Sequence, residues 1–328
     1  MLKILNLDPE RYSAQALAIL SRVGTIETLT GDATLADVIA DYHVIILRFS
    51  HRIDRTLIQR AQSLKIIACN ATGVDHIDEI AASEQGIQVL SLKGHTDFLD
   101  TIHATAELTW GLILNTIRPI PRALSAVKQT HWQRDDFFAH ELHGKTLGII
   151  GLGRIGKKIA RYGHAFGMAI HGIDTQPLPP MLGDIPLHQA PSIAALFAKA
   201  DIISLHVSLV PETVALIDAH IFDAVRAAGH SVYLINTARG QLIDERALLA
   251  ALNDGTVRAA ALDVMNNENA PNFLENNPLI HYANTHDNLL ITPHIGGVTQ
   301  ESWEKTECFM ASAIVQALAP SLPTVAIS

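Results

Sequence analysis

The chain has 328 residues, of which 48% are hydrophobic and 17% are charged, and its formal net charge is -9. This length is sufficient for two domains with sizeable cores, and the acidic balance argues against nucleic acid as a partner, because a phosphate backbone requires a basic surface. Two cysteines exclude a disulfide framework, and the absence of a signal peptide pattern or a long apolar run predicts a cytoplasmic protein without a membrane partner.

The first 100 residues alternate short apolar runs with helical stretches, which predicts a small parallel α/β domain. Strands are predicted at 3–7, 44–47, 66–69 and 88–90, and helices at 14–21, 54–61 and 77–84. The sequence NATGVDHID follows the third of these strands, where open parallel sheets bind their ligands. The backbone N–H groups of Gly73 and Val74 are candidates for binding an anion there, and an ordinary strand-to-helix turn is the alternative.

A long helical period then begins at Thr101 and stops before Pro119, and a second helix is expected to end near Thr130. The sequence KTLGIIGLGRIGKKIARYGHAFGMAIHGIDTQP, residues 145–177, follows it. Its pattern is a buried strand, a glycine turn, an amphipathic helix, a second strand and an acidic residue.

Each part of this stretch suits a dinucleotide. Gly151 allows a tight turn, Gly153 lets the backbone approach a pyrophosphate, and Gly156 lets the helix pack closely on the strand. The positive end of the helix faces the phosphates. Asp174 falls 18 residues after Gly156, where a carboxylate can accept both hydroxyls of a ribose. The alternative is a structural turn in a nucleotide-free α/β domain.

Three further strand patterns, DIISLHV, SVYLINTARG and RAAALDVM, are separated by helical patterns. One of these is DERALLAALNDG, with Asp244 as the expected N-cap and Gly255 as the expected stop. Residues 265–288 are rich in Asn and Pro and are predicted to form a long surface loop. The last strand is NLLITPHIGGVT, and a helix over about 300–318 follows.

Four charged or titratable residues follow these strands, at the edge where such folds bind ligands. Arg239 offers a planar fork for a carboxylate, and His294 can exchange a proton near neutral pH. Glu268 can fix the histidine tautomer, and Asp263 stands nearby in sequence. Each has a structural alternative, such as an ion pair or a helix cap. Together with a nicotinamide site they suit hydride transfer to a 2-oxo acid. The HELH sequence at 140–143 lacks the spacing of a zinc helix, so no metal site is expected.

At this point the sequence resembles the D-isomer-specific 2-hydroxyacid dehydrogenase family, in its phosphoglycerate dehydrogenase-like branch and without a regulatory domain. The matching motifs are GLGRIGKKIA, HGID, LHVSLVPET, INTARGQLIDERALLAAL, AALDV and TPHIGGVTQES, in family order. The resemblance implies an α/β protein of two doubly wound parallel-sheet domains with a cleft between them. A flavodoxin-like substrate domain comprises residues 1–100 and 294–328, and a Rossmann NAD-binding domain comprises 101–293. It also implies a homodimer built on the NAD-binding domains.

Carried over by motif, the resemblance implies Arg239, Glu268 and His294 as the catalytic residues. Substrate binding is implied for Gly73 and Val74, which resemble the family's carboxylate-binding turn. The implied cofactor contacts are Gly151, Gly153, Arg154, Ile155, Gly156, Asp174, His206, Thr213, Thr237, Ala238 and Asp263, the last for the nicotinamide carboxamide. The interval from Glu268 to His294 is longer than the family usually has, which leaves Glu275 as an alternative partner of the histidine.

These motifs predict an NAD-dependent dehydrogenase acting on a D-2-hydroxy acid or its 2-oxo acid. Asp174 favours NAD over NADP, because a carboxylate repels a 2′-phosphate. Arg48 and Arg52, in the sequence LRFSHR, suit a second anionic group on the substrate, and 3-phosphoglycerate and hydroxypyruvate or glyoxylate are the candidates. The alternative function is an NAD-sensing corepressor of the same fold. A formate dehydrogenase is disfavoured, because those relatives carry glutamine at the position of Glu268.

Overall fold

The computed structural model describes residues 2–31 and 33–319, and the chain forms two compact units. Unit 1 comprises Met1–Ile102 and Val298–Ser328, and unit 2 comprises His103–Gly297. Within the described residues, no helix combines the length and the apolar character that crossing a membrane requires.

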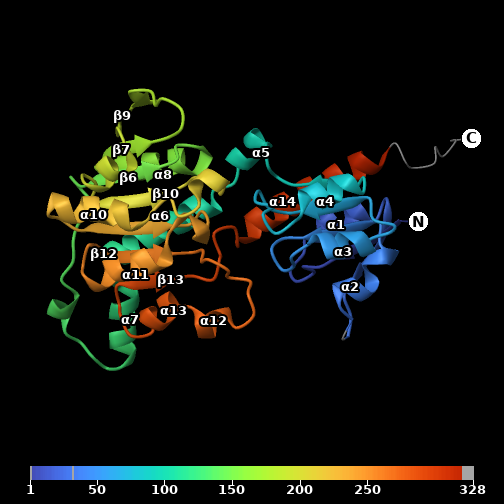
Figure 1. The fold of residues 1–328 in the computed structure, drawn as a ribbon, viewed down its shortest axis with the longest axis horizontal. Coiled ribbons are helices and arrows are strands. Elements are labelled where there is room, and N and C mark those ends of the chain that lie inside the picture. Colours follow the sequence, from blue (N-terminus) through green and yellow to red (C-terminus); the bar gives the residue numbers. More distant parts are fainter. Residues whose placement is uncertain (1, 32, 320–328) are drawn as a thin grey trace, which may run out of the picture. The chain divides into compact units, whose positions relative to one another are not determined.

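Unit 1 is a parallel sheet of five strands in the order β2-β1-β3-β4-β5. Figure 1 labels the helices of this unit. The strands are β1 (Leu2–Asn6), β2 (Gly24–Thr28), β3 (Val44–Leu47), β4 (Ile66–Cys69) and β5 (Gln88–Leu90). The helices are α1 (Ala14–Leu20), α2 (Leu35–Val38), α3 (Arg55–Arg60), α4 (Glu79–Glu84), α5 (Thr96–Asp100) and α14 (Gln300–Leu318), with a 3-10 turn η1 (Ile39–Asp41). This strand order is the flavodoxin-like one.

The central strands of unit 1 are apolar on both faces, since every residue of β3 and β4 is buried. Continuous apolar strands are typical of parallel sheets that are covered by helices on both sides. The edge strand β2 was not predicted, because its sequence GTIET contains no apolar run and only its glycine is buried. Gly24 lies so close to β1 that a β-carbon would stand 2.4 Å from the Leu2 carbonyl oxygen.

Unit 2 is an eight-stranded sheet in the order β13-β12-β11-β10-β6-β7-β9-β8. Its strands are β6 (Thr146–Ile150), β7 (Ala169–Ile173), β8 (Met181–Leu182), β9 (Ile185–Gln189), β10 (Ile202–Leu205), β11 (Val232–Asn236), β12 (Val257–Leu262) and β13 (Leu289–Ile291). All neighbours pair in parallel except β8, which pairs antiparallel with β9 at the edge. From β9 to β12 the order is that of a Rossmann sheet, with β6 as its first strand. The two doubly wound parallel sheets predicted from the sequence are therefore confirmed.

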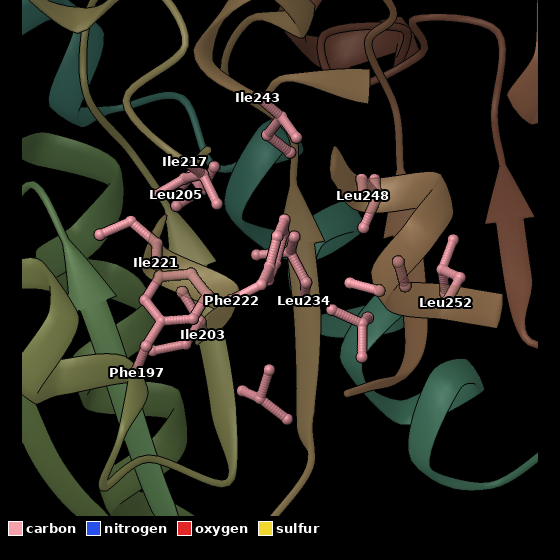
Figure 2. Close-up of a cluster of buried hydrophobic side chains, with 14 of the residues drawn as sticks. Phe197, Ile203, Leu205, Ile217, Ile221, Phe222, Leu234, Ile243, Leu248 and Leu252 are labelled. Atoms are coloured by element: carbon pink, nitrogen blue, oxygen red, sulfur yellow. The ribbon is translucent and has the colours of Figure 1, made fainter. Parts of the chain in front are cut away.

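Helices cover both faces of the unit 2 sheet. One face packs on α6 (Ala104–Ile117) and α8 (Arg154–Ala165) around buried Ile113 and Ile159. The other packs on α9 (Ile193–Phe197), α10 (Ala219–Ala228) and α11 (Glu245–Asn253), and Figure 2 shows the side chains of this second cluster. The remaining elements are α7 (Ile120–Lys128), α12 (Phe273–Asn276), α13 (Pro278–Ala283) and the 3-10 turns η2 (Arg134–Phe137), η3 (Pro211–Thr213) and η4 (Gly240–Leu242).

The prediction of one long loop over residues 265–288 is wrong, because this segment contains α12 and α13. Asn277 caps the start of α13, and Pro278 occupies its first turn. Leu279 and Tyr282, three residues apart, are buried in the same core cluster as α10 and α11. The helical period was too short to stand out among the asparagines.

Candidate active site

The glycine turn after β6 has the geometry that close backbone approach requires. Gly151 has a φ of +90°, and a β-carbon on it would stand 2.7 Å from the His206 carbonyl oxygen. A β-carbon on Gly156 would stand 2.0 Å from the Gly151 carbonyl oxygen, so only glycine lets α8 start so close to the strand. Gly153, by contrast, faces open space, since no atom lies within 4 Å of the place where its β-carbon would stand. The space over Gly153 and the start of α8 suit a pyrophosphate.

The acidic residue at the end of β7 stands beside this turn. One Asp174 carboxylate oxygen accepts a hydrogen bond from the Leu152 backbone N–H at 2.7 Å, and the other accepts one from Thr175 Oγ1 at 3.2 Å. The side chain is therefore oriented from within the glycine turn itself. Arg154 and Ile155, the first residues of α8, are both half-buried. These residues fit the dinucleotide that the sequence predicts.

Four more of the expected cofactor residues follow β10 and β11, namely His206, Thr213, Thr237 and Ala238. Burial lowers the pKa of His206 to about 3, so its ring is neutral at pH 7, and its Nε2 lies 2.8 Å from Ser204 Oγ. Thr213 Oγ1 donates toward the carbonyl oxygens of the 208–213 turn and accepts from the Val210 N–H at 2.9 Å. Thr237 Oγ1 lies 2.7 Å from Thr109 Oγ1 on α6, which ties the loop after β11 to the helix layer.

Arg239 lies on a turn that a buried asparagine shapes. Asn236, the last residue of β11, is 0% exposed. Its Nδ2 donates to the Arg239 carbonyl oxygen at 2.8 Å, and its Oδ1 accepts from the Ala238 N–H at 3.0 Å. The Arg239 side chain is half-buried, and one of its guanidinium nitrogens donates to the Ala238 carbonyl oxygen at 2.7 Å. Sequence reasoning missed Asn236; its position one residue before the TARG sequence was the available signal.

Glu268 Oε1 and His294 Nδ1 are joined by a hydrogen bond, and a quarter of each side chain is exposed. The second carboxylate oxygen of Glu268 accepts from the Met265 N–H at 3.0 Å. Burial raises the pKa of the Glu268 carboxyl, but His294, the Met265 N–H and the nearby positive charge of Arg239 outweigh it and hold that pKa below its usual range. The three predicted catalytic residues thus lie together in unit 2. The histidine pairs with Glu268, whereas the alternative Glu275 is exposed on α12.

The turn that carries His294 is held by Asp263, which directly follows β12 and is 1% exposed. Its carboxylate accepts from Thr292 Oγ1 at 2.6 Å, from the Ile295 N–H at 2.8 Å and from the Gly296 N–H at 2.8 Å. Burial raises the pKa of Asp263, and these three hydrogen bonds offset only part of the increase.

The predicted substrate residues Arg48, Gly73 and Val74 belong to unit 1. The guanidinium of Arg48 pairs with the fully buried Glu307 of α14 and lies 4.0 Å from the centre of the Trp303 ring. Gly73 and Val74 lie in the turn after β4. Among the residues that the structure describes, none accepts a hydrogen bond from either backbone N–H group. These two donors are available to an anion, whereas Arg48 already has an anionic partner.

Comparison with known proteins agrees with this geometry. Residues 110–296 match the model of the family described as D-isomer specific 2-hydroxyacid dehydrogenase, NAD binding domain. The D-3-phosphoglycerate dehydrogenase of Methanocaldococcus jannaschii is 38% identical over 97% of this chain, and that of Archaeoglobus fulgidus is 35% identical over 98%. Each alignment covers 58% of the relative, so the chain spans little more than half of either protein.

Solved structures of similar length also match. The crystal structure of D-lactate dehydrogenase from Aquifex aeolicus, complexed with NAD and lactic acid, has a TM-score of 0.81 and 27% identity, over 97% of this chain and 96% of that one. The TT0316 protein from Thermus thermophilus has a TM-score of 0.81 and 31% identity, over 97% of both chains. The family match covers the glycine turn, Asp174 and the three predicted catalytic residues. The chain therefore belongs to the D-isomer specific 2-hydroxyacid dehydrogenase family.

Proposed function

We propose that this protein is an NAD-dependent oxidoreductase that interconverts a D-2-hydroxy acid and its 2-oxo acid. Unit 2 is the NAD-binding domain, and unit 1 is the substrate domain. The observation that carries the proposal is the Glu268–His294 pair, with Arg239 near it, on the loops that follow the strands of a dinucleotide-binding sheet. The dehydrogenases among the relatives do not favour the corepressor alternative.

Each catalytic residue has a distinct role in this proposal. NAD, when bound, supplies the nicotinamide that accepts or donates the hydride. Arg239 binds the substrate carboxylate and polarises the C2 oxygen through charge-assisted hydrogen bonds. His294 gives that oxygen a proton during reduction and takes it back during oxidation, while Glu268 orients the imidazole and stabilises its protonated form. Asp263 would hold the nicotinamide carboxamide of bound NAD, and the N–H groups of Gly73 and Val74 in unit 1 would bind an anionic group of the substrate.

For the substrate we propose 3-phosphohydroxypyruvate and its reduced form, with hydroxypyruvate or glyoxylate as the alternative. The name shared by the curated relatives and the arginines of the LRFSHR sequence support a phosphorylated substrate. The ion pair between Arg48 and Glu307 weighs against Arg48 as the phosphate ligand, because its charge is already compensated. Arg52, which is exposed, is the better candidate.

An NADH-oxidation screen tests both levels of the proposal. Purified protein is assayed with 3-phosphohydroxypyruvate, hydroxypyruvate, glyoxylate and pyruvate at matched concentrations. We expect turnover with at least one of them and the highest kcat/KM with the phosphorylated acid. Failure to reduce any 2-oxo acid would reject the enzyme assignment, and equal turnover of 3-phosphohydroxypyruvate and pyruvate would reject only the phosphate subsite.

The cofactor choice is tested separately. The Asp174 carboxylate is already fixed by the Leu152 N–H, so it cannot turn away from a 2′-phosphate without losing a 2.7 Å hydrogen bond. No arginine follows it at 175–177 to compensate the phosphate charge. We expect kcat/KM to be higher with NADH than with NADPH. Asp174→Ala should bring the two kcat/KM values closer together. A preference of the unmodified protein for NADPH would contradict this role of Asp174.

We further propose a homodimer through the NAD-binding units, in the cytoplasm. The surface of α7 and the segment after it supports this assembly, because large apolar side chains stand exposed there. They are Ile120, Leu124, Val127, Trp132 and Phe138. No residue of α7 is buried within the chain. Apolar patches of this kind commonly mark protein–protein contacts.

A further inference from the structure

We call the segment Asn266–Asn277 the glutamate loop, because it carries Glu268. Its first and last residues both donate a hydrogen bond to the same carboxylate, that of Glu245. The Asn266 N–H donates to Glu245 Oε1 at 2.7 Å, and Asn277 Nδ2 donates to Glu245 Oε2 at 3.0 Å. A single side chain thus closes the loop at both ends. Neither Glu245 nor Asn277 was singled out from the sequence.

Glu245 is itself fixed on a rigid element. It is the first residue of α11, where a carboxylate is favoured by the helix dipole, and Asp244 caps the helix by accepting from the Arg246 and Ala247 N–H groups. Leu248 and Leu252 anchor α11 in the core cluster of Figure 2. The carboxylate therefore occupies a position that the core of unit 2 determines.

The orientation of the Asn277 amide is also determined. Its Oδ1 accepts from the Leu279 N–H at 2.9 Å and from the Ile280 N–H at 3.3 Å, as the N-cap of α13. Its Nδ2 must then point the other way as a donor, and Asn277 is only 7% exposed. The side chain at position 245 must therefore accept two hydrogen bonds at once, one from Asn277 Nδ2 and one from the Asn266 N–H. A carboxylate does this, and a glutamine in the same orientation does not.

We propose that Glu245 is a positioning residue that aligns Glu268 with His294 by fixing the glutamate loop. The inference rests on the proposed function. Glu268 stands two residues after Asn266. Its carboxylate accepts a hydrogen bond from the backbone N–H of Met265, the residue directly before the loop. Release of Asn266 from Glu245 would let this start of the loop move, and the Glu268–His294 bond depends on its position. A displacement of about 1 Å can cost on the order of 10²-fold in rate.

The directions of these hydrogen bonds allow a test by reversal. In Glu245→Gln, one amide nitrogen faces the Asn277 Nδ2, donor against donor, and in Asn277→Asp two carboxylates face each other. In the double variant Glu245→Gln/Asn277→Asp, the glutamine oxygen accepts from Asn266 and its nitrogen donates to the new carboxylate, whose other oxygen caps α13. All bonds are restored, and the side-chain bond has the opposite polarity. Glu141→Gln, at an exposed position of the same unit, is the matched control.

We expect each single variant to lower kcat for 2-oxo acid reduction by roughly 10- to 100-fold. KM for the 2-oxo acid should stay within about twofold, because the Arg239 turn keeps its own hydrogen bonds to the Asn236 amide in these variants. The pH profile of reduction should move to lower pH, as expected when His294 loses its aligned partner. The double variant should regain most of the activity and the original profile, and Glu141→Gln should match the unmodified protein.

A measurement that does not depend on turnover completes the design. Spectra of ¹⁵N-labelled histidine, assigned with His294→Asn, report the Nδ1 hydrogen bond and the protonation of His294 across pH. We expect these signals to change in both single variants and to return in the double variant. If the protein reduced no 2-oxo acid, the proposed function would be rejected. The spectra would still show whether Glu245 positions Glu268 against His294. The inference is overturned if the single variants lower only the melting temperature and leave the His294 signals unmoved, or if the double variant recovers neither signals nor activity.

Discussion

His294 has a backbone φ of +53°, in the left-handed region that a residue with a β-carbon rarely adopts. Such a conformation costs of order 1–3 kcal/mol and persists only where the surroundings determine it. Here the surroundings are the Asp263 carboxylate and carbonyl oxygen, which accept bonds from His294, Ile295 and Gly296. Since the imidazole of His294 is also hydrogen-bonded to Glu268 through Nδ1, both the backbone and the side chain of the histidine are held without a substrate.

The first prediction concerns this imidazole. Replacing His294 with Ala removes the acid/base group but leaves the glycine turn and Asp174 intact. We expect kcat for reduction to fall by roughly 10²–10⁴-fold, the usual range for a lost proton donor. Steady-state kinetics give kcat, and NADH fluorescence titration should show binding close to that of the unmodified protein. Near-normal turnover in this variant would remove His294 from the chemistry.

The second prediction concerns its partner. The pKa of the Glu268 carboxyl is lowered, so the group is an anion at neutral pH and favours a protonated imidazole. Reduction needs His294 protonated and oxidation needs it neutral. Changing Glu268 to Gln removes the negative charge, so the rate of reduction should begin to fall at lower pH, and oxidation should become active at lower pH. Rates measured in both directions across pH give the profiles, and unmoved profiles would contradict the pairing.

At the scale of elements, two of the three catalytic side chains, Arg239 and His294, lie on loops that a buried polar residue at a strand end fixes. Asn236 ends β11 and shapes the Arg239 turn, and Asp263 follows β12 and shapes the His294 turn. The two strands are neighbours in the sheet, and the Asp263 N–H donates to the Asn236 carbonyl oxygen at 2.9 Å. The sheet register therefore sets the spacing between the arginine and the histidine.

A third prediction tests the packing between two of these loops. A β-carbon on Gly240 would stand 2.0 Å from the Met265 carbonyl carbon and 2.3 Å from the Asn266 nitrogen, both of them backbone atoms that cannot rotate away. Gly240→Ala should therefore destabilise the protein by ~1–3 kcal/mol, as overpacking does. It should also lower activity, because the start of the glutamate loop is displaced. Urea unfolding measures the first effect and kcat the second.

Gly111 provides the control for this substitution. It lies in α6, and a β-carbon there would have no atom within 4 Å. Gly111→Ala should be neutral or should stabilise the protein by roughly 0.5–1 kcal/mol, because alanine loses less backbone entropy in a helix. Equal stability of the Gly240→Ala variant and the unmodified protein would mean that residues 265–266 are free to move.

Some elements were predicted closely from the sequence and others were missed. The apolar runs VIIL, IIAC and TLGII predicted β3, β4 and β6 closely, because fully buried parallel strands leave a continuous signal. The edge strand β2 and the short helices α12 and α13 were missed, since pairing and capping, not apolar content, define them. The anchors Glu245 and Asn277 could not be predicted, because their partners become neighbours only through the fold. Asn236 was missed although it directly precedes the TARG sequence. Arg48 illustrates the same point, since its partner Glu307 lies 259 residues away.

At the scale of the whole molecule, the two units have separate cores and different strand orders. Arg239, Glu268 and His294 all belong to unit 2, so one sheet and its loops set their mutual geometry. The network around Arg48 belongs to unit 1, where Glu307 also accepts from the Ser13 N–H at 2.6 Å. This network joins the start of α1, the end of β3 and the helix α14, which returns to unit 1 after the chain has formed unit 2. One buried carboxylate thus connects two parts of unit 1 that are far apart in the sequence.

The last prediction concerns assembly. Ile120, Leu124 and Val127 recur at four- and three-residue spacing, which puts them on one face of α7, and Leu124 is 60% exposed. Trp132 and Phe138 follow at 83% and 95% exposure. Side chains of this size are costly to leave in water, at ~25 cal/mol per Å² of apolar surface, and a second copy of the chain would cover them.

Leu124→Glu should therefore convert a dimer into a monomer, because a charge would be buried without a partner. Sedimentation equilibrium measures the mass, with Ile80→Glu, a comparably exposed apolar position in unit 1, as the control. A monomeric unmodified protein, or a Leu124→Glu variant that stays dimeric, would show that this face is not the interface.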